Sequence, residues 1–138
     1  MKHQELQSAH EQLDTLRMRY EDLFLNAPVP YLILDRLGRI HQVNRRCMTE
    51  FGDINRYSGS VFMAWVDRAY KSHFMQNLTK VLRTREPQRF ELKILDSTSK
   101  ETKVVLAEMA IAYDELLLEN VVRVALIDIS KQRETERR

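Results

Sequence analysis

Residues 28–44 constrain the fold of this chain more than any other part of its 138 residues. The apolar run at residues 31–34 and a second strand-like segment, in which Ile40 and Val43 resume the apolar pattern, flank a turn that contains Asp35 and Gly38. Asp35 is suited to accept hydrogen bonds from the backbone of that turn, and Gly38 supplies the positive φ that a tight turn requires. The segment therefore predicts a β-hairpin.

The first 26 residues predict one amphipathic helix, which ends before Pro28 and Pro30. Its apolar residues recur at alternating steps of three and four, which places them on one helix face. They are Leu6, Ala9, Leu13, Leu16, Tyr20 and Leu23. Such a stripe serves either as a coiled-coil seam between two copies or as a face laid on the chain's own domain. Both interpretations stay open from the sequence, and the stripe residues other than Ala9 are the candidate dimer seam.

After the hairpin, Asn44 is a suitable N-cap for a short helix over residues 45–51. A longer helix is expected over about residues 67–84, with its apolar stripe at Val66, Tyr70, Phe74, Leu78, Val81 and Leu82. Three strands follow, a half-buried one around residues 90–94 and two longer ones over residues 102–113 and 120–129.

The last two strands are apolar on both faces. Val104, Leu106 and Ala110 lie on one face, and Val105, Ala107, Met109 and Ile111 lie on the other. Antiparallel sheets usually leave one face in water. We therefore expect the second face to be covered, and the N-terminal helix, of the same chain or of a neighbouring copy, is the element available to cover it.

The hairpin resembles the opening hairpin of PAS domains, in which a strand ending in Asp, a Gly-containing turn and a second strand ending in Asn precede small helices. Residues 121–130, which end in Asp128-Ile-Ser130 and lead into a charged segment, resemble the final PAS strand and its exit motif. The resemblance implies an α+β PAS fold, a five-stranded antiparallel sheet with helices on one face, plus the N-terminal amphipathic helix. The expected division is a helical arm over residues 1–26, a PAS domain over 27–130 and the start of a C-terminal linker over 131–138.

Composition excludes several classes of protein. The formal charge of +2 is small beside 22 basic and 20 acidic residues, which does not indicate a nucleic-acid partner. Neither a signal-peptide pattern nor an apolar run long enough to span a membrane is present, so we expect a cytoplasmic protein with no membrane contact by this segment. The single cysteine, Cys47, excludes an internal disulfide.

Motifs for catalysis are also missing. Three scattered glycines cannot form a phosphate-binding loop, and the four histidines show no metal-ligand spacing with one another or with Cys47. We therefore expect no catalytic residues and no metal site. One alternative is a small-molecule enzyme on a cone-shaped α+β fold, with His73, Asn77 and Glu108 as candidate acid/base residues. A second is a pure interaction module with a filled core.

The cofactors known from PAS domains are disfavoured by the residues present. Flavin-adduct members place a cysteine in a later helix motif, whereas Cys47 directly follows the hairpin. Haem-binding members use a histidine on the long helix, and His73 lies roughly 80° from the centre of the apolar stripe at 100° per residue. We expect no cofactor, although an unidentified small ligand is compatible with the sequence.

Asn77 is predicted near the centre of the stripe, where a buried amide needs partners. It either bonds a neighbouring strand or loop or anchors a small ligand in an apolar pocket. The candidate pocket consists of Tyr70, Phe74, Asn77, Leu78, Phe90 and Leu92. Glu108 and Arg123 interrupt the two apolar strands and are placed to pair across the last hairpin.

The sequence thus favours a non-catalytic sensory and dimerisation module of a signal-transduction protein of the histidine kinase or diguanylate cyclase type. The resemblance implies a homodimer that passes a signal through Asp128 and Ser130 to a downstream effector domain. Ser130 is a suitable N-cap for the next helix, and Asp128 is suited to fix the exit angle.

Overall fold

A computed structural model of the chain describes residues 2–52, 60–96, 100–114 and 117–129. Ser130 and the C-terminal segment lie outside these residues, as do the side chains of Leu6, Leu13 and Tyr20 within the N-terminal helix. Among the described residues, no helix combines the length and the apolar character that crossing a membrane requires.

The order of elements agrees with the predicted one. The helices are α1 (Lys2–Leu25), α2 (Arg45–Phe51) and α3 (Lys71–Thr84), with two 3₁₀ turns, η2 (Phe62–Trp65) and η3 (Arg68–Tyr70), between α2 and α3. The strands are β1 (Tyr31–Leu34), β2 (Ile40–Val43), β3 (Gln88–Leu95), β4 (Thr102–Asp114) and β5 (Glu119–Asp128). The expected long helix begins at Lys71 rather than near Asp67, because a 3₁₀ turn capped by Asp67 comes first.

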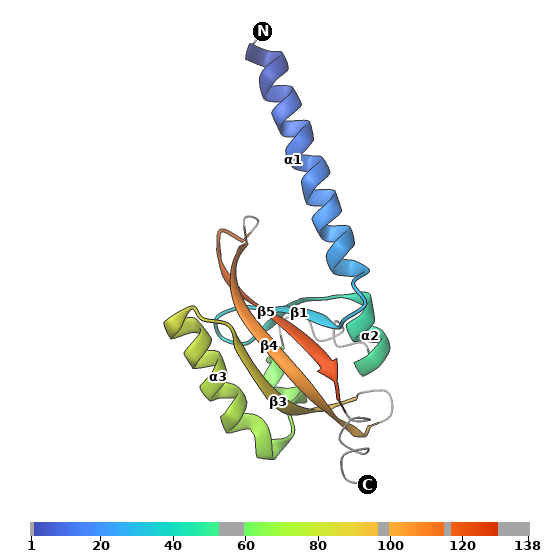
Figure 1. The fold of residues 1–138 in the computed structure, drawn as a ribbon, viewed down its shortest axis with the longest axis vertical. Coiled ribbons are helices and arrows are strands. Elements are labelled where there is room, and N and C mark those ends of the chain that lie inside the picture. Colours follow the sequence, from blue (N-terminus) through green and yellow to red (C-terminus); the bar gives the residue numbers. More distant parts are fainter. Residues whose placement is uncertain (1, 53–59, 97–99, 115–116, 130–138) are drawn as a thin grey trace.

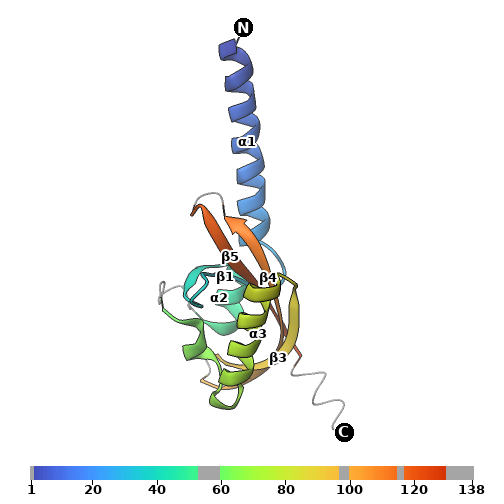
Figure 2. The same ribbon diagram turned by 90° about the vertical axis from the view of Figure 1, so that its left-hand side faces the viewer.

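The strands form one five-stranded sheet in the order β2-β1-β5-β4-β3, and every neighbouring pair is antiparallel. β5 is therefore the central strand. Figure 1 shows α2 and α3 against one face of this sheet, and Figure 2 shows the same layers from the side. The predicted fold class, a five-stranded antiparallel sheet with helices on one face and an N-terminal helix, is confirmed.

The core lies between the sheet and the helices. Alternation along the strands directs Leu92 of β3, Ala107 of β4 and Val124 of β5 into it, and all three are fully buried. Phe62 of η2 and Phe74 of α3 fill the helical side, with ring centroids 5.3 Å apart. The face that carries these side chains is called the inner face below.

The opposite, outer face is more apolar than an exposed sheet face usually is. Val104, Leu106 and Ala110 of β4 lie on it and are partly exposed. The sequence placed these three residues together on one face of the strand, opposite Val105, Ala107 and Met109. α1 does not cover this face. It leaves the domain as a single projecting helix in both views, and Leu16 on it is 59% exposed (Figures 1 and 2).

Candidate functional site

The predicted ligand pocket lies within the inner-face core. Phe74 and Leu78 of α3 meet Phe90 and Leu92 of β3 in one buried cluster, and Tyr70 packs against it partly buried. Five of the six predicted pocket residues are therefore brought together. The shared environment is apolar and filled by large side chains, so a ligand in this place requires some of them to move.

Asn77 lies at the margin of that core. It is half-buried, and its side-chain amide donates to the carbonyl of His73 one turn earlier in α3, at 2.8 Å. The expected bond from Asn77 to a neighbouring strand or loop is thus replaced by a bond within the helix. The reason is the boundary of α3. Val66 and Tyr70 precede the helix, so its buried stripe is centred on Phe74, Leu78 and Val81, about 70° from Asn77.

The residues of the enzymatic alternative are separated by the sheet. His73 is exposed on α3, which packs on the inner face, and its ring makes an edge contact with Phe90 at a centroid distance of 5.4 Å. Glu108 points to the outer face, because the neighbouring Ala107 and Met109 are buried in the inner core. His73, Asn77 and Glu108 therefore do not form one acid/base site.

Asn44 ties the start of the domain to α2. Its side-chain oxygen accepts from the backbone N–H of Tyr31 at 2.9 Å and of Cys47 at 3.0 Å, and its amide donates to the carbonyl of Val29 at 2.9 Å. The contact with Cys47 confirms the predicted helix cap. The same residue also fixes the segment that connects α1 to the sheet.

The chain leaves the sheet beside the point where it enters. The backbone N–H of Leu126 in β5 donates to the carbonyl of Pro30, just before β1, at 2.9 Å. Asp128 ends β5 with an exposed side chain, and the N–H of Ile129 still bonds the carbonyl of Val104 at 3.0 Å. The exit is therefore held by the sheet up to residue 129, and the predicted role of Ser130 lies outside the described residues.

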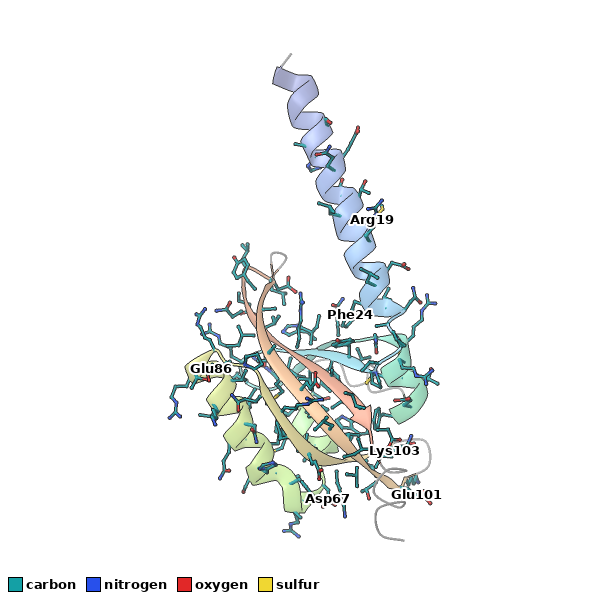
Figure 3. All side chains as sticks on the ribbon, viewed as in Figure 1. Arg19, Phe24, Asp67, Glu86, Glu101 and Lys103 are labelled. Atoms are coloured by element: carbon teal, nitrogen blue, oxygen red, sulfur yellow. The ribbon has the colours of Figure 1, made fainter. Side chains whose placement is uncertain are left out.

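A hollow of about 380 Å³ opens on the outer face, at the base of α1. We call it the outer hollow. It is lined by Leu23, Phe24, Tyr31, Pro87, Glu108, Met109, Ala110, Arg123 and Ala125. Phe24 reaches it from the last turn of α1 and meets the ring of Tyr31 at a centroid distance of 6.4 Å (Figure 3). α1 thus contributes one wall of a site whose floor is the sheet.

Charged groups border the outer hollow. Glu108 on β4 forms an ion pair with Arg89 on β3 at 3.0 Å, and Arg123 of β5 lies opposite Ala110 in the register of the sheet. The sequence indicated polar interruptions at Glu108 and Arg123 and an apolar second face. It gave no signal for the participation of Phe24 and Pro87, because these residues are brought to the strands only by the packing of the connecting segments.

The seam residues whose side chains are described, Leu16 and Leu23, are 59% and 71% exposed. Leu23 also borders the outer hollow. These two side chains of the predicted stripe are therefore largely exposed to solvent in a single chain.

Comparisons with known proteins agree with this architecture. A family model described as the PAS domain matches residues 18–83, from the second half of α1 to the end of α3. Together with the sheet topology and the solved structures below, this match identifies the fold. Residues 18–83 match the PAS domain family, and the chain has the PAS fold.

The structure resembles several solved PAS domains. A PAS domain of an HTR-like protein from Haloarcula marismortui is 22% identical, with a TM-score of 0.66 over 89% of this chain and 99% of that chain. A domain of a sensory box sensor histidine kinase/response regulator from Geobacter sulfurreducens is 18% identical, with a TM-score of 0.66 over 82% and 95%. No protein with a curated description matches the chain.

The PAS domain of the Cronobacter turicensis RpfR quorum-sensing receptor, solved in complex with BDSF, is 21% identical, with a TM-score of 0.59 over 75% of this chain and 96% of that chain. At these identities the similarity establishes the shared PAS fold. The residues of the present chain must carry any argument about its ligand.

Proposed function

We propose that this PAS domain is the sensory module of a signal-transduction protein and performs no catalysis itself. The observation that carries the proposal is the position of β5. Val122, Val124 and Leu126 of this central strand are buried in the core, and the same strand ends at the exit of the domain. A change of packing in the core therefore acts directly on the strand that leads out of the sheet.

The entry segment is coupled to the same strand. The hydrogen bond from Leu126 to Pro30 joins β5 to the connection that follows α1. A shift of β5 thus reaches both α1 and the segment after Asp128. The proposed partner for this output is a downstream effector domain of the histidine kinase or diguanylate cyclase type, in a cytoplasmic protein without nucleic-acid or membrane contacts in this segment. A similar fold in a sensor histidine kinase supports the first of these effector classes.

The proposed input is a small apolar ligand that enters the inner-face core between α3 and β3. The core is lined there by Phe74, Leu78, Phe90 and Leu92. The RpfR domain with a similar fold has also been solved in complex with C12:0, which makes dodecanoic acid a defined first probe. A ligand that binds only the folded state raises the melting temperature by mass action.

Thermal melting with dodecanoic acid and a metabolite library tests this input. We expect at least one compound to raise the melting temperature of the wild type. The shift should disappear in Leu92→Phe, because the larger side chain occupies the space between α3 and β3 that the ligand would enter. Ala110→Leu is the matched control, because it adds apolar volume on the outer face, and it should keep the shift. If no compound stabilises the wild type, the ligand part of the proposal fails and the interaction module with a filled core takes its place.

We further propose that the chain is a homodimer in which the α1 stripe forms the seam. Leu16 and Leu23 are exposed in a single chain, and each large apolar side chain removed from water contributes roughly 1 kcal/mol or more. The double substitution Leu13→Glu and Leu16→Glu should shift the protein towards monomer in sedimentation velocity. Met18→Glu, at an exposed position about 200° around the helix from Leu16, should leave the dimer intact. An unchanged sedimentation profile of the double variant at micromolar concentration would contradict the seam.

The residues do not fit haem or a flavin adduct, and the purified protein is expected to be colourless. Cys47 is buried in α2, where burial, followed by the charge of Glu50, raises the pKa of its thiol to about 12. His73 is exposed on the surface of α3 rather than in the core. A Soret band that is lost in His73→Ala, or flavin absorbance in the blue, would contradict this expectation.

A further inference from the structure

The outer hollow is a concave site of its own, on the opposite side of the sheet from α3. Its volume of about 380 Å³ lies at the small end of the range for small-molecule pockets. Its lining residues come from α1, from β1, β4 and β5, and from the segment just before β3. A small molecule in this hollow therefore contacts several elements that are far apart in the sequence.

The floor of the outer hollow carries small side chains. Ala110 of β4 and Ala125 of β5 lie on adjacent strands, and Ala125 lies opposite Tyr31 of β1 in the register of the sheet. Three residues with rings, Phe24, Tyr31 and Pro87, line the same hollow, and the rings of Phe24 and Tyr31 are tilted by 40° at a centroid distance of 6.4 Å. Aromatic rings attract one another in offset and edge-to-face arrangements at such distances. Methyl groups beneath and rings beside them favour a flat aromatic group over a branched one.

The charges at the outer hollow favour an anion. Arg123 and Glu108 both line it, and the carboxylate of Glu108 already forms its ion pair with Arg89 at 3.0 Å. Among the described residues named here, two guanidinium groups thus stand against one carboxylate, and one positive charge is in excess. A guanidinium binds a carboxylate through two parallel hydrogen bonds, which fixes the orientation of the bound group. An aromatic ring that carries a carboxylate therefore matches both the shape and the charge of the hollow.

We propose that the outer hollow is a binding site for a planar aromatic carboxylate, whose ring lies on Ala110 and Ala125 and whose carboxylate pairs with Arg123. Phe24 belongs to the last turn of α1 and Arg123 to the central strand β5, so the ligand contacts both elements at once. A ligand held there stabilises one position of α1 relative to the sheet. This site goes beyond the proposed function, because its ligand and its position differ from those of the apolar input in the core.

Two-dimensional amide NMR of the full chain, with 2-naphthoate as the probe, tests the site residue by residue. The amides of residues 108–110 and 123–125 should shift and saturate, with a dissociation constant of about 1 mM or tighter. The amides of residues 74–78 in α3, across the sheet, should keep their positions. The uncharged analogue 2-naphthamide should bind about tenfold more weakly, because it cannot form the ion pair.

Two substitutions separate the ring contact from the charge contact. Ala110→Leu places a larger side chain on the floor and should abolish the saturable shifts. Arg123→Gln should weaken the binding of 2-naphthoate about tenfold and leave that of 2-naphthamide unchanged, a selectivity that a general loss of structure would not produce. Arg83→Gln is the matched control, since it removes the same charge at an exposed position on α3 and should leave both dissociation constants unchanged.

The possible results distinguish this site from the proposed input in the core. Preference for the carboxylate that is lost in Arg123→Gln supports the proposal, whereas equal affinity of the wild type for 2-naphthoate and 2-naphthamide overturns it. Shifts confined to α3 and β3 that disappear in Leu92→Phe place the probe in the core, which overturns the second site and supports the proposed input. The absence of any saturable shift up to about 10 mM overturns the second site and leaves the proposed function to its own test by thermal melting.

Discussion

Asn44 is fully buried, and its side chain makes three hydrogen bonds to backbone groups of two different segments. One of these partners, the carbonyl of Val29, belongs to the connection between α1 and β1, and another, the N–H of Tyr31, belongs to the first residue of β1. The third, the N–H of Cys47, is an otherwise unpaired donor at the start of α2. The side chain of Asn44 thus provides hydrogen bonds that these three backbone groups would otherwise have to make with water.

Replacing Asn44 by alanine should lower the free energy of unfolding by about 2 to 4 kcal/mol, because it removes a helix cap and leaves buried backbone groups without partners. Urea denaturation with intrinsic fluorescence measures the loss. Thr49→Ala is the control, since its hydroxyl bonds the carbonyl of Arg45 at an exposed position, and it should change stability by less than about 0.5 kcal/mol. Equal effects of the two substitutions would contradict the role assigned to Asn44.

Asp35 holds the β1–β2 turn. Burial by itself raises the pKa of this carboxyl group, but hydrogen bonds from the backbone N–H and side chain of Arg39 and from the N–H of Leu37, with the positive charge of Arg39, outweigh it and leave the pKa below the ordinary value of 3.8. The bonds from Leu37, Arg39 N and Arg39 Nε are 2.8, 2.9 and 2.9 Å long. The folded protein therefore binds a proton at Asp35 less readily than the unfolded chain does.

A carboxyl group whose pKa is lower in the folded protein than in the unfolded chain stabilises the fold at pH values above the unfolded pKa of about 3.9. This stabilisation is lost as the pH falls through the folded-state pKa. Asp35→Asn should accordingly lower stability at pH 7 and reduce the fall of stability between about pH 5 and pH 2. Urea midpoints measured across this range test the prediction. Parallel pH profiles of wild type and variant would show that Asp35 does not contribute.

At the scale of elements, the apolar stripe predicted for α3 was correct for the helix itself but placed Asn77 wrongly. The spacing of Phe74, Leu78 and Val81 identified the buried face of the helix, and all three are in the core. Extending the same stripe back to Val66 and Tyr70 moved its expected centre towards Asn77. Those two residues belong to the 3₁₀ region before α3, where the angle per residue differs, so Asn77 lies on the flank instead.

This placement changes what a substitution at Asn77 should do. The amide of Asn77 donates to the carbonyl of His73, which the backbone ladder of the helix already engages, so Asn77→Leu leaves no buried group without a partner. Since leucine is the better helix former, we expect stability to change by less than about 0.5 kcal/mol in urea denaturation. A loss of about 1 to 3 kcal/mol would instead indicate a buried partner of the amide.

The helices and strands could be predicted because they depend on residues close together in the sequence. The outer hollow could not be predicted, because it depends on packing between distant segments. The turn at Asp35 and Gly38, the cap at Asn44 and the alternation of β4 each depend on neighbours in the sequence. The outer hollow depends on contacts between α1, β4 and β5, such as the one between Phe24 and Tyr31, which no local pattern encodes.

At the scale of the whole molecule, α1 stands apart from the domain that it precedes. α1 has 24 residues and, among its described side chains, contacts between its last turn and the domain such as the one between Phe24 and Tyr31. A helix with so little packing is only marginally stable in water, because most helix stability in proteins comes from the packing of an apolar face. The exposure of Leu16 and Leu23 shows that one chain supplies little of that packing. The order of α1 should therefore depend on association with a second copy, whereas the sheet and its core should not.

Hydrogen exchange measured by mass spectrometry separates these two parts. In the wild type at concentrations that favour the dimer, backbone amides of residues 8–20 should be protected, because opening α1 also requires its partner to leave. In a Leu16→Glu, Leu23→Glu variant the same amides should exchange at least tenfold faster, as expected for an isolated helix. Amides of β4 and β5 serve as the internal control and should exchange alike in both proteins, since their hydrogen bonds and core contacts lie within one chain. Equal exchange of residues 8–20 in the two proteins would show that α1 is not stabilised by association, and faster exchange throughout β4 and β5 would show that the folding of the domain itself depends on the dimer.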